Sequence, residues 1–170
     1  MTPAPRPELD AAYSDDKAAP TPWADASAAL EEAGVYWVVT VRTSGRPHVT
    51  PVAGAWIEDA FYFSTGAGEQ KAKNLAANPR VAVVTGCNYF EEGLDVVIEG
   101  DVRRVGSDDA SLVEQVAKTL NDKYDNFFGF VAKDGCFLNE AGGEADVYVV
   151  DRTKAFAYGR GAAYSATRYR

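Results

Sequence analysis

The chain has 170 residues, enough for one domain with a sizeable core, and its formal net charge of −8 argues against nucleic acid as a partner. It contains no apolar run of about 18 residues, so we expect no membrane-spanning helix. With one histidine and two widely separated cysteines it lacks the ligand clusters of common metal sites, and we expect two reduced thiols and no metal.

Residues 1–20 are rich in Pro, Ala and Asp without periodicity, which predicts a flexible N-terminal arm before a single domain over residues 21–170. The arm has no basic stretch followed by an apolar one, so we expect no secretory signal and a cytoplasmic protein. Thr21-Pro22 then supplies an N-cap and a first-turn proline for a helix that Gly34 ends.

Three strands are predicted next, because β-branched and aromatic residues recur between turn residues. These strands cover residues 35–42, 48–57 and 60–65, with turns at Ser44-Gly45 and Glu58-Asp59. Alternation divides the second strand into two faces, of which we expect the second to be core. The first face holds His48, Thr50, Val52, Gly54 and Trp56, and the second holds Val49, Pro51, Ala53, Ala55 and Ile57.

The rest of the chain predicts two helices and four strands. The helices cover residues 69–77, ended by Asn78-Pro79, and about 108–123. The strands cover residues 80–85, 95–105, 146–150 and 155–158, and residues 124–143 carry no clear signal. Short strands joined by tight turns, with inserted helices, predict a mainly β fold with flanking helices: an antiparallel barrel of six to seven strands. No GxGxxG follows a strand, which disfavours a Rossmann domain.

Residues 64–73, which we call the phosphate clamp, combine features that hold a phosphate. Ser64 and Thr65 end a strand, a loop of Gly and Ala exposes backbone N–H groups, and Lys71 and Lys73 bring positive charge. Residues 36–85 carry 5 bases against 3 acids in an acidic protein, which also favours an anionic ligand. The alternative is a solvated helix with two surface lysines.

Several motifs follow one another in an order that resembles a known family. They are GRPHVTPV at 45–52, YFSTG at 62–66, KAKNLAANPRV at 71–81 and VVIEGDVRRV at 96–105, and the ending TRYR at 167–170 is similar to that of one branch. Together they resemble the flavin-binding split-barrel family related to pyridoxamine 5'-phosphate oxidase. The resemblance implies a six- to seven-stranded antiparallel split β-barrel that forms a homodimer, with FMN or the deazaflavin coenzyme F-420 between the subunits.

The resemblance also assigns roles to individual residues. Lys71 contacts the cofactor phosphate, Ser64 and Thr65 assist it, and the strand from His48 to Val52 lies beside the ring system. Arg168 is expected at the cofactor or at the subunit interface. The implied cofactor-binding residues are His48, Val49, Thr50, Pro51, Val52, Ser64, Thr65, Lys71, Lys73, Asn74 and Arg168.

One position departs from the family pattern. Some deazaflavin-binding members carry an arginine two residues before the clamp lysine, where this chain has Glu69. A carboxylate there would repel a phosphate. We therefore expect the arginine's contact to be missing, or to be supplied by Lys73, Arg80 or the C-terminal arginines.

The resulting hypothesis is an FMN- or deazaflavin-dependent oxidoreductase that transfers hydride to or from a small unsaturated organic substrate. The alternatives are a non-catalytic flavin- or haem-binding split barrel and a pyridoxamine 5'-phosphate oxidase. Gly54 would allow close approach of a planar ligand, or mark a bend in the barrel. His48 would donate to a ring carbonyl or protonate a substrate, or lie at the rim without a role, so no catalytic residue is predicted.

Overall fold

The computed structural model describes residues 4–138 and 142–170, and in this part of the chain every strand pairing is antiparallel. One path of hydrogen-bonded neighbours runs β1-β11-β10-β7-β6-β2-β3, while β5 and β9 branch from β10 and pair with β4 and β8. The strands are β1 Pro7–Leu9, β2 Tyr36–Val41, β3 Pro47–Val52, β4 Gly54–Ile57, β5 Ala60–Thr65, β6 Arg80–Thr85, β7 Gly93–Val105, β8 Val131–Lys133, β9 Cys136–Leu138, β10 Glu144–Arg160 and β11 Ser165–Tyr169.

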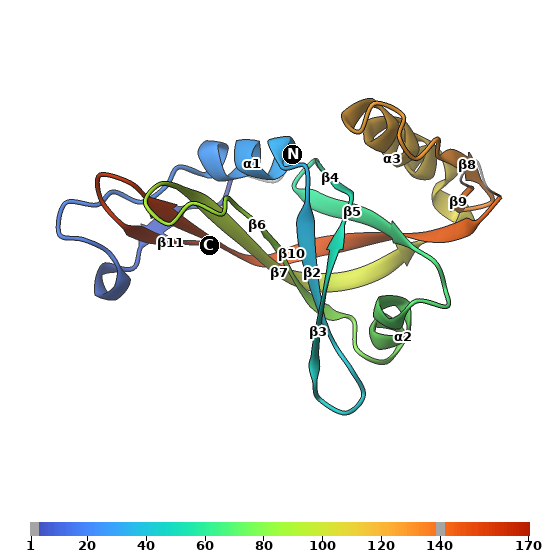
Figure 1. Ribbon diagram of the computed structural model, residues 1–170, viewed down its shortest axis with the longest axis horizontal. Helices are drawn as coiled ribbons and strands as arrows, with labels where there is room; N and C mark the ends of the chain where they lie inside the picture. Colours follow the sequence, from blue (N-terminus) through green and yellow to red (C-terminus); the bar gives the residue numbers. More distant parts are fainter. Residues whose placement is uncertain (1–3, 139–141) are drawn as a thin grey trace.

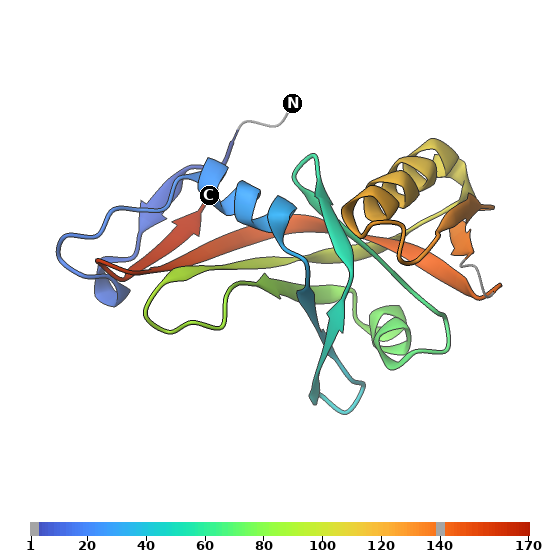
Figure 2. The same ribbon diagram turned by 45° about the horizontal axis from the view of Figure 1, so that its top comes forward.

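Three α-helices flank this sheet, as predicted (Figure 1). They are α1 Trp23–Glu32, α2 Gln70–Ala77 and α3 Ala110–Lys123, and single 3-10 turns cover Ala11–Tyr13 and Ser107–Asp109. Figure 2 shows α1 against one half of the sheet, α3 beside β8 and β9, and α2 on the far side of β5 from α3. Among the described residues, none of the helices has the length and apolar content needed to span a bilayer.

Local turn chemistry explains why the first hairpins form where the sequence predicts them. Glu58 and Asp59 both have positive φ, at 49° and 70°, so the β4–β5 connection is a two-residue turn whose twist suits a hairpin. Gly45 has a φ of 80° in the β2–β3 turn. The observed β5 and β6 have the predicted bounds, and the mainly β class with flanking helices is confirmed.

The structure corrects the prediction of a single strand over residues 48–57. It divides at Ala53 into β3 and β4, and its expected core face in β3 is the exposed one. Val49 is 52% exposed and Pro51 is also exposed, whereas His48 and Thr50 are half-buried. Both faces of β3 carry apolar residues, so alternation separates the faces without saying which one turns inward.

The end of the chain differs from the prediction in a second way. The strands expected over residues 146–150 and 155–158 form one continuous strand, β10, which passes a bulge between Arg152 and Lys154. The strand β11, which follows it, was not predicted, and neither were β8 and β9 in the unassigned segment 124–143. The described residues therefore form more strand segments than the six to seven expected.

Part of the N-terminal segment that was predicted to be a flexible arm forms the strand β1, which pairs with the C-terminal strand β11. Pro7, Glu8 and Leu9 pair with Tyr169, Arg168 and Thr167 of β11. A short strand gains its hydrogen bonds only from this distant partner, so composition alone gave no sign of it. Residues 1–3 of the expected arm lie outside the described residues.

Two hydrophobic clusters form the core, one between α1 and the sheet and one beneath α3. The first cluster includes Leu30, Tyr36, Phe61, Phe63, Ile98 and Tyr169. The second includes Tyr62, Val105, Val116, Leu120, Phe137 and Val149.

Arg152 joins the β4–β5 turn to α1, since its guanidinium pairs with Asp59 and lies 4.8 Å from the Trp23 ring.

Candidate functional site

The phosphate clamp forms around the first turn of α2, and its lysine is buried. Lys71 is only 8% exposed, and its ammonium group pairs with the Glu69 carboxylate. The other oxygen of that carboxylate accepts a 2.9 Å hydrogen bond from the Gly66 backbone N–H. A backbone N–H and a buried ammonium therefore meet at one anionic group at the N-terminus of the helix, which is the arrangement that binds anions.

The electrostatics of Glu69 follow from these contacts. Burial alone would raise the pKa of Glu69, but hydrogen bonds from Lys71 and Gly66 outweigh it, and the pKa of Glu69 lies below its ordinary value. The carboxylate is therefore ionised at neutral pH. Glu69 was predicted from the sequence to repel a phosphate, but its ion pair with Lys71 was not predicted.

A second set of contacts joins α2 to the inner side of the sheet. Asn74, which is 2% exposed, donates a 2.8 Å hydrogen bond to the Thr40 hydroxyl and accepts one of 2.8 Å from Gln70. The Thr40 hydroxyl lies 3.4 Å from His48 Nδ1. The sequence analysis missed Thr40, although a threonine inside the apolar run VYWVVTVR is the kind of residue that needs a buried partner.

The strand β3 offers the candidate ring-binding residues, but it offers them on two faces. His48, Thr50 and Val52 are half-buried, and the Thr50 hydroxyl oxygen is buried without a hydrogen-bond partner. Val49 and Pro51 point to the opposite, exposed side. A buried hydroxyl without a partner favours a polar group of a ligand at that place. Among the described residues of one chain, the His48 side of β3 is joined to α2 through Thr40 and Asn74.

The remaining predicted residues are distributed between the clamp and the far end of the sheet. Ser64 and Thr65 end β5 directly before the clamp loop, and Thr65 is buried. Lys73 is exposed on α2, on the solvent side of the helix. Arg168 lies on β11, where it pairs with Asp10, and both views place β11 well away from α2 (Figures 1 and 2). One chain therefore does not bring Arg168 to the clamp.

Gly54 serves packing in this structure. A Cβ atom at Gly54 would lie 2.3 Å from the Phe61 ring, so the glycine makes room for a core side chain. Its backbone N–H donates to the Tyr124 hydroxyl at 3.0 Å, and its carbonyl accepts from the same hydroxyl at 3.2 Å. Gly54 begins β4 directly after the point where the predicted strand divides, and its contacts there are with core residues of this chain.

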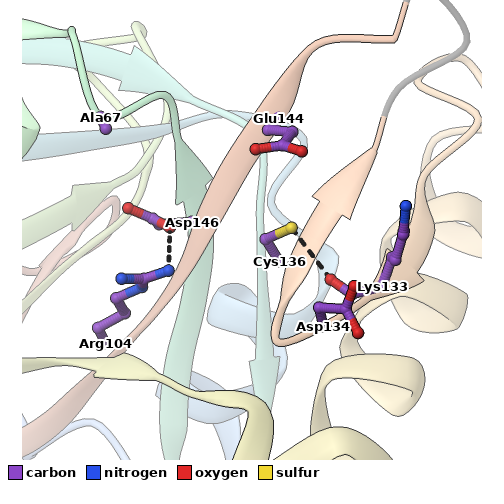
Figure 3. Close-up of a pocket in the computed structure, with 7 residues that line it drawn as sticks. All are labelled: Ala67, Arg104, Lys133, Asp134, Cys136, Glu144 and Asp146. Carbon is purple, nitrogen blue, oxygen red and sulfur yellow. Dashed lines mark hydrogen bonds and ion pairs between the residues drawn. The ribbon is translucent and has the colours of Figure 1, made fainter.

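A polar cavity of about 270 Å³ lies on the other side of the clamp loop, next to Ala67 (Figure 3). Two of its five charged residues, Arg104 and Asp146, form an ion pair 2.6 Å apart. The Cys136 thiol lies at its wall and donates to the Lys133 carbonyl. Burial and the neighbouring carboxylates raise the pKa of Cys136, which keeps the thiol protonated and unreactive.

Both cysteines are free, as predicted, and the described residues contain no group of three side chains suited to a metal.

The sequence matches a family profile described as pyridoxamine 5'-phosphate oxidase over residues 23–137. This match covers α1, the clamp, α3 and every strand from β2 to β8. Among curated proteins, none matches this chain.

Solved structures share the fold at low sequence identity. A structure described as F420 Reductase is 24% identical, with a TM-score of 0.55, over 76% of this chain and 94% of its own. An FAD-binding protein from Mesorhizobium loti is 16% identical, with a TM-score of 0.60, over 86% and 94%. A heme binding protein from Mycobacterium smegmatis is 14% identical, with a TM-score of 0.63, over 84% of this chain and 55% of its own. At these identities the comparisons establish a shared fold.

Proposed function

The chain belongs to the pyridoxamine 5'-phosphate oxidase family, and on that premise we propose that it is an oxidoreductase that binds FMN or the deazaflavin coenzyme F-420. Its substrate would be a small unsaturated organic molecule that gains or loses hydride. The bound ring supplies the hydride chemistry, and the protein supplies binding and orientation.

The observation that carries the proposal is the arrangement at the start of α2. Lys71 is buried, yet its ammonium group and the Gly66 N–H both point at one anionic group. Burying a lysine is costly unless an anion compensates it, so this arrangement supports a site for negative charge over a solvated helix surface. Both candidate cofactors carry a phosphate that Lys71 and Gly66 would hold.

The inner side of β3 supplies the groups that would face the ring. The Thr50 hydroxyl is buried without a partner and can donate to a ring carbonyl. His48 is held near Thr40, and Thr40 is held by Asn74 of α2. His48, which would face the ring, is therefore connected to α2, which would bind the phosphate, through the buried side chains of Thr40 and Asn74.

Of the two candidate cofactors, the deazaflavin is favoured by two features. The sequence KAKNLAANPRV, which covers the clamp lysine, resembles the deazaflavin-binding branch, and so does the ending TRYR. The structure described as F420 Reductase also has the highest identity of the three structures compared. FMN remains the alternative as the usual cofactor of the wider family.

We also propose that the active form is a homodimer. One outward face of the sheet, which we call the outer sheet face, is apolar across five neighbouring strands, and Trp37 on it is 47% exposed. Because cross-strand partners lie on the same side, the registers place these residues together. The outer sheet face comprises Trp37, Val39, Val49, Pro51, Ala82, Val84, Val97 and Phe156. A second copy of the chain would cover this face.

A binding titration tests the proposed function. Purified, cofactor-free protein is titrated with FMN and with coenzyme F-420 while tryptophan fluorescence is followed. Binding of one of them at micromolar concentration or below would identify the cofactor and limit the substrate search to its chemistry. Binding of neither would overturn the oxidoreductase proposal.

Two alternatives are tested in the same way. A haem-binding barrel would show haemin binding that depends on His48, the one histidine of the chain. A pyridoxamine 5'-phosphate oxidase would turn over pyridoxamine phosphate with FMN bound, and it would need a second phosphate site besides residues 64–73. Turnover of pyridoxamine phosphate would replace the proposal with this activity.

A further inference from the structure

Two donors of the clamp, the Gly66 N–H and the Lys71 ammonium group, are already used by one side chain of the protein itself. The Gly66 N–H donates to one oxygen of Glu69, and the Lys71 ammonium group donates to the other. The positive charge of Lys71 is thereby balanced within the chain. A ligand phosphate that enters this site meets a carboxylate where it would place its own oxygens.

We propose that Glu69 is a built-in competitor for the phosphate group of the ligand: the phosphate binds the clamp only by displacing the Glu69 carboxylate from Lys71 and Gly66. The inference rests on the proposed function, because it concerns the same site. It assigns Glu69 a role in specificity, since a ligand without a phosphate group has no anion to offer Lys71 in exchange for the carboxylate.

The geometry allows this displacement without unfolding of α2. The Glu69 side chain is 53% exposed, whereas the Lys71 side chain is 9% exposed, so the carboxylate can turn into solvent while the ammonium group stays in place. The Glu69 backbone is held separately, because its N–H donates to Gly66 at 3.0 Å and its carbonyl accepts from Lys73 at 3.1 Å. Only the side chain of Glu69 has to move.

Charge decides which anion is bound. The phosphate monoester of FMN carries about −1.5 to −2 charges at pH 7 and has three strong acceptor oxygens, whereas the carboxylate carries one charge and two oxygens. The phosphate of F-420 is a diester with one charge, so the advantage in charge applies to FMN. A partly exposed ion pair contributes about 0.2–1 kcal/mol. Loss of the Glu69 charge should therefore strengthen phosphate binding by up to about fivefold, because 1.4 kcal/mol corresponds to a factor of ten.

The experiment compares Glu69→Gln with Glu114→Gln, which removes the same charge from an exposed position on α3 far from the clamp. The dissociation constants of FMN and of riboflavin, which lacks the phosphate, are measured for the wild type and both variants. If the wild type binds only F-420, F-420 and its phosphate-free deazaflavin replace this pair. In Glu69→Gln the phosphate-bearing ligand should bind more tightly, by about 1.4- to fivefold, with the phosphate-free ligand unchanged. Glu114→Gln should change neither.

The outcomes separate this inference from the proposed function. Equal or weaker binding of the phosphate-bearing ligand in Glu69→Gln, with wild-type binding intact, overturns the competitor role and leaves the cofactor proposal standing. Such a result would mean that Glu69 positions Lys71 for the ligand.

If no variant binds FMN or F-420, the proposed function has failed, and inorganic phosphate then tests Glu69 alone. The amide resonance of Gly66 is followed during a phosphate titration. A tighter phosphate response in Glu69→Gln than in the wild type supports the competitor role, and the absence of a response in both overturns it.

Discussion

The side-chain amide of Asn74 on α2 donates a 2.8 Å hydrogen bond to the hydroxyl of Thr40 on β2, and both side chains are buried. This bond crosses from the helix that carries Lys71 to the strand beside His48. The position of the clamp relative to the sheet therefore depends on a polar contact inside an otherwise apolar strand.

Replacing the hydroxyl at this contact should destabilise the protein. In Thr40→Val the buried Asn74 amide loses an acceptor, which we expect to lower the free energy of unfolding by about 1–3 kcal/mol. Urea denaturation followed by tryptophan fluorescence measures the change. Thr119→Val is the matched control, because the Thr119 hydroxyl is exposed on α3. Equal effects of the two substitutions would show that the Asn74–Thr40 hydrogen bond adds no more to the free energy of unfolding than the exposed hydroxyl of Thr119 does.

Removing the clamp lysine should weaken cofactor binding. We expect Lys71→Ala to cost roughly 1.5–3 kcal/mol of binding free energy for whichever of FMN and F-420 the wild type binds, the range for a hydrogen bond to a charged group. Fluorescence titration gives both dissociation constants. Lys118→Ala, on the outer side of α3 where the side chain is 77% exposed, should leave the affinity unchanged. Unchanged affinity in Lys71→Ala would mean that residues 64–73 do not hold the phosphate.

The buried amine of Lys123 should make stability depend on alkaline pH. Its Nζ lies 2.7 Å from the Tyr36 hydroxyl, and burial lowers the pKa of Lys123 from 10.5 to about 8. Above about pH 8 the folded protein has released a proton that the unfolded chain still holds. The free energy of unfolding therefore rises with pH through this group, until the unfolded amine titrates near 10.5.

The test compares the pH dependence of unfolding in Lys123→Met and in the wild type. Urea denaturation between about pH 7.5 and 9.5 should show a smaller rise in the variant, and Lys118→Met should behave like the wild type. The range ends below pH 10 because burial raises the pKa of Tyr36, which opposes the trend once tyrosines in the unfolded chain ionise. Parallel pH profiles for the wild type and Lys123→Met would contradict the assignment.

A charge on the outer sheet face should disrupt the proposed homodimer. Val49→Lys places an unpaired ammonium group on the β3 side of that face, where Val49 is 52% exposed, and we expect it to weaken association at least about tenfold, since an unpaired buried charge costs more than 1.4 kcal/mol. Sedimentation equilibrium measures the effect. Val131→Lys on β8 is the matched control, because Val131 is 61% exposed and lies outside the outer sheet face. A wild-type chain that sediments as a monomer would reject the homodimer.

Much of the fold could be predicted because its signals are local. Turn residues such as Glu58 and Asp59 mark the β4–β5 hairpin, and Asn78-Pro79 marks the end of α2. Val116 and Leu120 lie four residues apart on α3, a spacing that places them on one helix face, and both are buried. The residues of the candidate clamp could also be recognised in the sequence, because the loop, the hydroxyls and Lys71 follow one another within ten residues.

Other features depended on contacts that no local pattern contains. The pairing of β1 with β11 joins Glu8 to Arg168 across nearly the whole chain, so composition indicated only a flexible arm. The bond between Asn74 and Thr40 likewise joins residues 34 positions apart. The ion pair of Glu69 with Lys71 is close in sequence, but residues two apart do not face each other on a regular helix, and the N-terminal position of Glu69 outside α2 makes the contact possible.

The sequence by itself determined the class of fold and most element positions, because backbone preference and residue type act over a few residues, and it predicted residues 64–73 as a candidate phosphate site. Only the tertiary structure decided which face of β3 turns inward. Val49 and Val52 are equally apolar, so the strand's own pattern is satisfied in either orientation. The pairing of β3 with β2, and the contact of β2 with α2, turn His48 and Thr50 inward and leave Val49 on the surface.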